Sequence, residues 1–355
     1  MGTVQKYRMG GNCFGTHRSK EPVGSLPQQA TVLDASLPIY ENELLIEVES
    51  LNIDSASFHQ IKSVCGSSLP SMESHILNLV RSQGKHQNPV TGSGGMLIGT
   101  VADVGPKFEF KDGNLKKGDR IATLVSLTLT PLHIEKIKKI HLNLDRVDIS
   151  GHAVLFTTGI YSKLPSDIPE SLALAILDVC GAPAQTAELC KPGDTVVVIG
   201  GAGKSGVLCL YEAAKAVGPK GKVIALDYST EAVNGIRSLS FVKNAFAVDA
   251  RDALAVYEIV NKATDGKMAD LVINVANIPD TEMSCVLASK QGGVAYYFSM
   301  ATSFTKATLG AEGVGADVEL IMGNGYRPGH ADLALNILRQ APEIRKMYET
   351  KYGAS

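Results

Sequence analysis

A glycine-rich turn between an apolar run and a helical pattern constrains the fold of this chain more than any other feature. Residues 195–200 predict a buried strand, and residues 204–217 predict a helix. Between them lies a G-x-G-x-x-G pattern formed by Gly201, Gly203 and Gly206. We expect Gly201 to permit the tight turn, Gly203 to let backbone N–H groups approach a pyrophosphate, and Gly206 to let the helix pack against the strand. The helix N-terminus also favours an anion, so the turn predicts a dinucleotide site.

An acidic residue at the end of the next predicted strand supports this interpretation. Asp227 ends residues 222–227 and follows Gly206 by 21 residues. Its carboxylate is expected to accept hydrogen bonds from both ribose hydroxyls and to repel a 2′-phosphate, which favours NAD; NADP stays the alternative. The predicted cofactor-binding residues are Gly201, Ala202, Gly203, Lys204, Ser205, Gly206, Asp227, Tyr228, Asn277 and Ser299.

The two halves of the chain have different patterns. Residues 165–355 alternate between helical patterns and nearly continuous Val/Ile/Leu runs, as in parallel strands that are buried on both faces. Residues 1–164 carry short apolar runs between glycine and proline turns. Predicted elements of this half are strands at 43–51, 96–105 and 119–129 and one helical stretch at 72–80. We therefore predict an α/β protein with a β-rich domain over 1–164 and a doubly wound Rossmann domain over 165–355, the last part of which (329–350) is helical.

Composition excludes several classes of protein. The 355 residues carry a net charge of −2, which gives no broad electrostatic footprint for nucleic acid. The chain has no apolar run of about 18 residues and no apolar leader segment, so we expect no membrane partner. Its six cysteines are scattered without a CxxC spacing, which argues against a zinc cluster and predicts a reduced, cytoplasmic protein.

The order of these landmarks resembles the medium-chain dehydrogenase/reductase superfamily. Longer stretches resemble the L-erythro-3,5-diaminohexanoate dehydrogenase family nearly end to end. They are residues 11–19 (GNCFGTHRS), 51–58 (LNIDSASF), 84–106 (GKHQNPVTGSGGMLIGTVADVGP), 157–165 (TTGIYSKLP), 176–194 (ILDVCGAPAQTAELCKPGD) and 321–338 (IMGNGYRPGHADLALNIL). The resemblance implies a GroES-like first domain and a homodimer. It also implies an NAD-dependent oxidative deamination in lysine fermentation, in which a small diamino acid loses a hydride from C3 and yields 5-amino-3-oxohexanoate and ammonium.

The chain departs from the zinc-containing alcohol dehydrogenases of that superfamily. Their Gly-His-Glu-x-x-Gly stretch falls at residues 94–99, where Gly95 replaces the histidine and Met96 the glutamate. Their first zinc cysteine falls at about Asp54. We therefore expect no zinc. A free amine can expel hydride without the O–H ionisation that an alcohol needs, and proton transfer then passes to side chains.

Three residues are candidates for catalysis. Asp54 lies at the position that faces the nicotinamide in the superfamily, and a helix N-cap or a turn aspartate is the alternative role. Asp178 stands in an apolar stretch, where a carboxylate is either exposed at a cleft or buried with a partner. His86 can transfer protons near neutral pH, and a solvated loop is the alternative for it and for its neighbour Lys85.

Substrate binding calls for one cation and further carboxylate or hydroxyl partners. Arginine suits a carboxylate because its planar fork binds both oxygens. The candidate substrate-binding residues are Arg18, His17, Ser55, Lys85, Tyr326 and Arg327. Two rival interpretations stay open: a zinc-free quinone- or enoyl-type reductase of the same superfamily, and a protein that binds NAD(H) without turnover.

Overall fold

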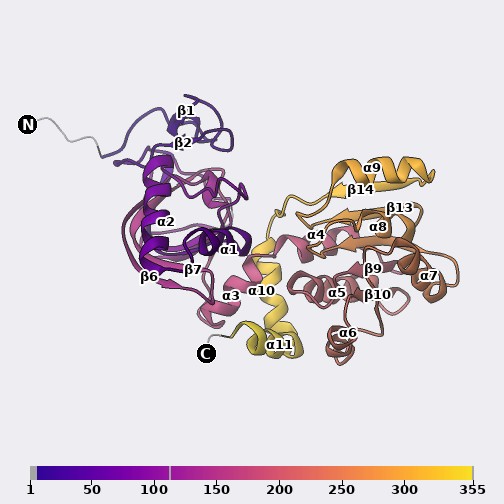
Figure 1. The fold of residues 1–355 in the computed structure, drawn as a ribbon. Coiled ribbons are helices and arrows are strands. Elements are labelled where there is room, and N and C mark those ends of the chain that lie inside the picture. The colour runs from indigo at the N-terminus through magenta and orange to yellow at the C-terminus, as the bar shows by residue number, and fades with distance from the viewer. Residues whose placement is uncertain (1–5, 112, 354–355) are drawn as a thin grey trace, which may run out of the picture. The chain divides into compact units, whose positions relative to one another are not determined.

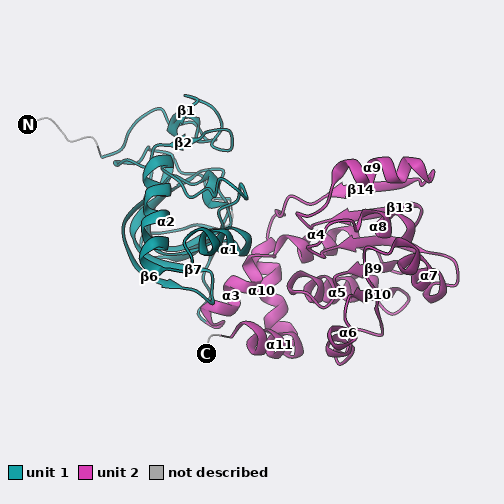
Figure 2. Cartoon of the chain, in the orientation of Figure 1, with its two compact units in different colours: residues 1–166 teal, residues 167–355 magenta. Residues whose placement is uncertain are grey.

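The computed structural model describes residues 6–111 and 113–353. The chain divides into two compact units, residues 1–166 and 167–355 (Figure 2). Each unit has a hydrophobic core of its own. Leu44, Phe58 and Ile76 belong to the core of the first unit, and Val197 and Val272 to that of the second.

The first unit is built on a six-stranded antiparallel sheet with the order β6-β7-β3-β4-β5-β8. Figure 1 shows two neighbouring strands of this sheet, β6 and β7. Its strands are β3 (Glu43–Asn52), β4 (Met96–Val104), β5 (Arg120–Thr123), β6 (Leu132–His141), β7 (Arg146–Phe156) and β8 (Tyr161–Lys163), and a separate pair joins β1 (Ser19–Glu21) to β2 (Val32–Leu33). Alternation places one face of the sheet in the core: in β6, Leu132 and Ile134 are buried while His133 and Glu135 between and after them are exposed.

The first unit contains two helices where the sequence predicts one. α2 (Leu69–Gln83) confirms the stretch around 72–80, because Met72, Ile76 and Val80 recur every four residues on its buried face. The omission of α1 (Ser55–Val64) was wrong. Its apolar pattern is weak, and it starts where Asp54 accepts a hydrogen bond from the Ser57 backbone.

The predicted strand over 119–129 is too long. Only β5 is extended, and a 3-10 turn, η2 (Leu127–Leu129), follows it. The cause is local, since the Ser126 side chain accepts from the Thr128 N–H and tightens the chain.

The second unit is the predicted doubly wound α/β fold. Its six-stranded parallel sheet has the order β11-β10-β9-β12-β13-β14. The strands are β9 (Thr195–Ile199), β10 (Lys222–Asp227), β11 (Asn244–Ala247), β12 (Ala269–Asn274), β13 (Ser289–Tyr297) and β14 (Val318–Met322). The helices are α3 (Glu170–Leu177), α4 (Gly181–Leu189), α5 (Lys204–Val217), α6 (Thr230–Arg237), α7 (Ala253–Ala263), α8 (Glu282–Ala288), α9 (Phe304–Gly313), α10 (His330–Gln340) and α11 (Pro342–Tyr352).

The strand order reverses at β9, which has β10 on one side and β12 on the other. In open α/β sheets, ligands bind outside the carboxyl ends of the strands at such a switch point. The glycine-rich turn starts from the carboxyl end of β9. The topology of the second unit therefore places the predicted dinucleotide site where this class of fold binds its ligands.

Among the described residues, no single helix has both the length and the apolar composition needed to cross a membrane. α3 and α4 meet these two requirements together, but a bend of 52° separates the two helices.

Candidate functional site

The turn after β9 combines a left-handed glycine with close packing. Gly200 has a φ of +84°, so the left-handed residue of the turn is Gly200. Gly201, for which the sequence predicts the turning role, follows it in the turn, where a Cβ would lie 3.1 Å from the Ala225 Cβ. A Cβ on Gly206 would lie 2.1 Å from the carbonyl oxygen of Gly200 and 2.7 Å from the Cα of Gly201. Only glycine therefore lets the first turn of α5 pack so closely on the strand end.

Asp227 ends β10 and faces the glycine-rich turn. Its Oδ2 accepts a hydrogen bond of 2.9 Å from the Ala202 N–H, and its Oδ1 accepts one of 2.8 Å from the Tyr228 N–H. Each carboxylate oxygen has further lone-pair capacity, so these two bonds leave Asp227 able to accept from ribose hydroxyls.

The other predicted cofactor residues follow neighbouring strands. Tyr228 is 70% exposed beside Asp227. Asn277 is exposed after β12, and Ser299 is half-buried after β13. The structure thus brings the predicted set to the carboxyl ends of β9, β10, β12 and β13, and the donor set fits a dinucleotide: a helix N-terminus for phosphate and a carboxylate for ribose.

Lys204, the first residue of α5, is held by two neighbours. Its ammonium forms an ion pair with Asp178 Oδ2, and its backbone carbonyl accepts from the Tyr348 hydroxyl of α11. The side chain of Asp178 is half exposed, and its Oδ1 has no hydrogen-bond partner within the described parts of the chain. Asp178 is therefore an exposed carboxylate with one basic partner and one oxygen available.

Tyr326 and Arg327 lie in the loop between β14 and α10. Arg327 Nε lies 2.7 Å from Glu188 Oε2 of α4. A Cβ on Gly181 would lie only 2.3 Å from the carbonyl oxygen of Gly325, so the loop packs directly on the start of α4. The second unit thus brings together two segments that lie about 140 residues apart in the sequence, α4 just after Asp178 and the loop that carries Arg327.

Asp54 caps α1 and accepts two hydrogen bonds. Its Oδ1 accepts from the Ser57 N–H at 2.9 Å, and its Oδ2 accepts from the Ser93 hydroxyl at 2.7 Å. The neighbouring predicted residue, Ser55, donates instead to Asp145 Oδ2 at 2.7 Å. The N-cap role of Asp54 is therefore real, and it leaves the half-exposed carboxylate fixed in orientation.

The chain leaves no room for a side chain at position 95. A Cβ on Gly95 would lie 2.0 Å from the carbonyl oxygen of Asn52 and 2.9 Å from the Asp54 backbone nitrogen. A histidine at this position would clash with the end of β3 at Asn52 and with the backbone that leads from it to Asp54. Within residues 6–111 and 113–353, no group of three or more His, Cys, Asp or Glu side chains is placed to hold a metal ion.

A cluster of three hydroxyls beside Asp54 escaped the sequence analysis. Ser57 Oγ lies 2.5 Å from Thr91 Oγ1 and 2.9 Å from Ser93 Oγ, and the last two oxygens are 3.0 Å apart. The one signal in the sequence is the run of small and polar residues at 91–95 (TGSGG).

Lys85 and His86 are fully buried, so the solvated-loop alternative was wrong for both. The Lys85 ammonium donates to the carbonyl oxygen of Ala30 at 2.5 Å and is not placed to meet a substrate carboxylate. Burial lowers the pKa of His86 to about 4, although the nearby charge of Asp54 raises it. The premise that His86 titrates near neutral pH was therefore wrong, and the ring is neutral at pH 7.

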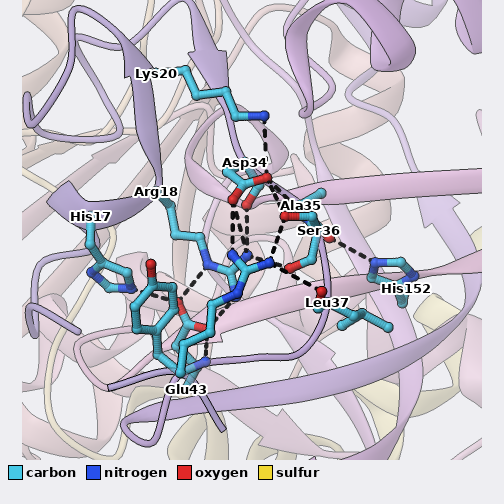
Figure 3. A network of polar contacts seen from close by, with 11 residues as sticks. His17, Arg18, Lys20, Asp34, Ala35, Ser36, Leu37, Glu43 and His152 are labelled. Atoms are coloured by element: carbon cyan, nitrogen blue, oxygen red, sulfur yellow. Dashed lines mark hydrogen bonds and ion pairs between the residues drawn. The ribbon is translucent and has the colours of Figure 1, made fainter. Parts of the chain in front are cut away.

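Arg18 and His17 belong to a polar network inside the first unit (Figure 3). Arg18 is fully buried and binds both carboxylate oxygens of Glu43, through Nε at 2.8 Å and Nη2 at 2.5 Å. Its Nη1 donates to the carbonyl oxygens of Asp34 and Ser36. His17 Nε2 lies 2.7 Å from Glu43 Oε1. The protein's own groups therefore occupy the guanidinium that the sequence assigns to a substrate carboxylate.

Comparison with known proteins places this geometry in context. A profile of the L-erythro-3,5-diaminohexanoate dehydrogenase N-terminal domain matches residues 17–165. A curated L-erythro-3,5-diaminohexanoate dehydrogenase of Acetoanaerobium sticklandii is 51% identical over 344 residues, which cover 97% of this chain and 100% of the relative. One of Fusobacterium nucleatum is 50% identical over 339 residues, 96% of this chain and 98% of the relative.

Solved structures resemble the chain in fold alone. A mycobacterial quinone oxidoreductase is 18% identical, with a TM-score of 0.53 over 86% of this chain and 81% of its own. The CurK enoyl reductase is 18% identical, with a TM-score of 0.52 over 84% of this chain and 79% of its own. This likeness in fold, together with the antiparallel sheet of the first unit and the parallel sheet of the second, confirms the predicted fold class.

Proposed function

The chain belongs to the L-erythro-3,5-diaminohexanoate dehydrogenase family of oxidoreductases, and from that we propose that it oxidatively deaminates L-erythro-3,5-diaminohexanoate with NAD. The observation that carries the proposal is the sequence identity of 51% with the Acetoanaerobium sticklandii enzyme over nearly the whole length of both chains. The substrate, NAD and water give 5-amino-3-oxohexanoate, NADH, ammonium and one proton. The proposal places this reaction in lysine fermentation.

The second unit supplies the residues that suit the cofactor. We propose that backbone N–H groups of the glycine-rich turn and the start of α5 bind the pyrophosphate, and that Asp227 accepts from the adenosine ribose. NAD, when bound, accepts the hydride that leaves C3 of the substrate. The acceptor capacity of Asp227 and its negative charge support NAD over NADP.

The substrate carries two ammonium groups and one carboxylate, and the described contacts leave suitable partners for them. Asp54 presents a half-exposed carboxylate whose orientation two hydrogen bonds fix, and we propose that it takes the proton from the ammonium on C3. Asp178 has an oxygen available for the other ammonium. Arg327 is the remaining basic candidate for the carboxylate. Its partner Glu188 is an exposed side chain, whereas Arg18 and Lys85 are fully buried inside the first unit.

An assay of the purified full-length chain tests the proposal. With 3,5-diaminohexanoate and NAD at alkaline pH, we expect an increase in NADH absorbance that requires the amine, and a much smaller one with NADP. Because Gly95 leaves no space for the zinc histidine, dialysis against a chelator should leave the rate unchanged. Absence of amine-dependent NADH, with NADH binding still measurable, contradicts the proposal and favours a protein that binds NADH without turnover.

Two conservative variants test the proposed carboxylates. Asp54→Asn should lower kcat by about 100-fold or more, as loss of a proton acceptor does. Asp178→Asn should act mainly by raising KM, because it removes an ion partner rather than the acceptor. Full turnover in Asp54→Asn, or an unchanged KM in Asp178→Asn, removes that residue from the proposed site.

A further inference from the structure

The hydroxyl cluster beside Asp54 has fewer hydroxyl hydrogens than oxygen–oxygen contacts. Four oxygen–oxygen contacts connect it: the three among Ser57, Thr91 and Ser93, and the one from Ser93 to Asp54 Oδ2. Each hydroxyl brings one hydrogen. With Asp54 ionised, three hydrogens therefore serve four contacts, and one contact is left without a hydrogen.

A proton on Asp54 supplies the missing hydrogen. Asp54 Oδ2 can then donate to Ser93, which turns its own hydrogen into the cluster, so that all four contacts become hydrogen bonds. With the carboxylate ionised, Ser93 donates to Asp54, as the structure shows. The same four oxygens thus accommodate both protonation states without moving, which is what a group that gains and loses a proton in every turnover needs.

The cluster also leads from Asp54 to the surface. Ser57 is fully buried and Ser93 half-buried, whereas Thr91 is exposed. The loop that carries Thr91 is fixed, because the buried Asn88 accepts from the Val90 and Thr91 N–H groups. The hydroxyls therefore form a fixed path with one end on the carboxylate and the other in solvent.

We propose that Ser93 and Thr91 form a proton relay that carries to solvent the proton which Asp54 takes from the substrate ammonium. This inference rests on the proposed function. In each turnover the N–H bond of the ammonium breaks and an O–H bond forms on Asp54. Asp54 then gives a proton to Ser93, Ser93 gives one to Thr91, and Thr91 gives one to water, which releases the one proton of the overall reaction. Ser93 and Thr91 therefore act on the proton that Asp54 has taken up, and not on the substrate itself.

The titratable neighbours of Asp54 do not offer an equivalent exit. His86 is near enough for its pKa to respond to the charge of Asp54, but the ring is fully buried and that pKa is about 4. Neither of its ring nitrogens has a hydrogen-bond partner in the described stretches of chain, and the buried His75 Nε2 is also unpartnered there. These rings provide no hydrogen-bonded route to water, whereas the hydroxyls do.

Single-turnover experiments on the full chain with bound NAD and 3,5-diaminohexanoate test the relay. A pH-indicator dye follows proton release while absorbance follows NADH. We expect Ser93→Ala and Thr91→Val to delay proton release and to lower kcat by about tenfold to 100-fold. KM and the NADH Kd should stay within about twofold. Small buffer bases should restore the rate in proportion to their concentration, and Ser93→Thr should restore it without them.

Matched controls separate a relay from a loss of local structure. Ser82→Ala and Thr31→Val remove exposed hydroxyls of the same unit that bond only to backbone carbonyls, and both should behave as wild type. Proton release that stays synchronous with NADH at the wild-type rate in both relay variants overturns the inference. A raised KM without buffer rescue also overturns it, since that pattern indicates a structural role. Failure of the wild type itself to form NADH overturns the proposed function as well.

Discussion

The pair formed by Arg18 and Glu43 shows how a residue that suits a ligand can serve the fold instead. A segment with Cys13, His17 and Arg18 between glycines looks rich in chemistry, and the sequence assigns Arg18 to a carboxylate. The chemical class of its partner was predicted correctly, because Arg18 does bind both oxygens of a carboxylate. That carboxylate, however, belongs to the protein's own Glu43. Sequence alone does not distinguish the two, since a pair separated by 25 residues depends on tertiary contact.

We expect Arg18→Met to lower the free energy of unfolding by about 3–5 kcal/mol, because it leaves the buried Glu43 carboxylate without its main partner. The double variant Arg18→Met/Glu43→Leu should recover at least half of that loss, because it removes the stranded charge. Urea unfolding at pH 7 measures both. Equal losses in the single and double variants would mean that the pair contributes through packing and not through charge.

The pH dependence of this pair has a defined sign. Burial raises the pKa of Glu43, but hydrogen bonds from Arg18 and His17 outweigh it and hold the pKa below its ordinary value of 4.5. The contribution of the pair is therefore complete above pH 4.5 and is lost as the pH falls through the lower pKa of the folded state. The difference in the free energy of unfolding between wild type and Arg18→Met should therefore become smaller as the pH is lowered through that range.

At the scale of elements, the accuracy of the sequence analysis follows the strength of the local signal. In the second unit, the predicted bounds of α5 and β10 are those of the structure. A glycine-rich turn marks the start of α5, and a continuous apolar run marks β10. In the first unit α1 was missed, since its start depends on Asp54 accepting from Ser57 rather than on periodicity. The hydroxyl cluster was missed for a related reason: Ser57 meets Thr91 and Ser93 only through the fold.

The junction of β9 and α5 gives a prediction for an element. Gly206→Ala places a Cβ 2.1 Å from the backbone oxygen of Gly200, so strand and helix must separate or the glycine-rich turn must shift. We expect a loss of about 2 kcal/mol or more in stability and at least a tenfold weaker NADH affinity. Thermal unfolding and NADH fluorescence titration measure the two effects.

Gly235→Ala in α6 is the matched control for that variant. Nothing lies within 4 Å of a Cβ there, so the substitution should raise the free energy of unfolding, by at most about 1 kcal/mol, because alanine has the higher helix propensity. Its NADH affinity should equal that of the wild type. If Gly206→Ala also binds NADH normally, the close approach of α5 to β9 is not needed for the cofactor.

At the scale of the whole molecule, each unit has a sheet and a hydrophobic core of its own. All residues proposed to bind the cofactor lie in the second unit, on the carboxyl ends of β9, β10, β12 and β13. The residues of the proposed relay all lie in the first unit. Cofactor binding and proton transfer are therefore assigned to separately built parts of the chain, and they can be tested separately.

We expect residues 167–355, expressed alone, to fold and to bind NADH, because the sheet, the glycine-rich turn and Asp227 are all present in this unit. A concentration of NADH 100-fold above its Kd should then stabilise the fragment by about 2.7 kcal/mol, which thermal unfolding detects as a raised Tm. Asp227→Ala in the same fragment is the control and should lose most of that shift while keeping its circular dichroism. A folded fragment whose Tm does not respond to NADH would mean that residues 1–166 also hold the cofactor, and the assignment of binding to one unit would then be wrong.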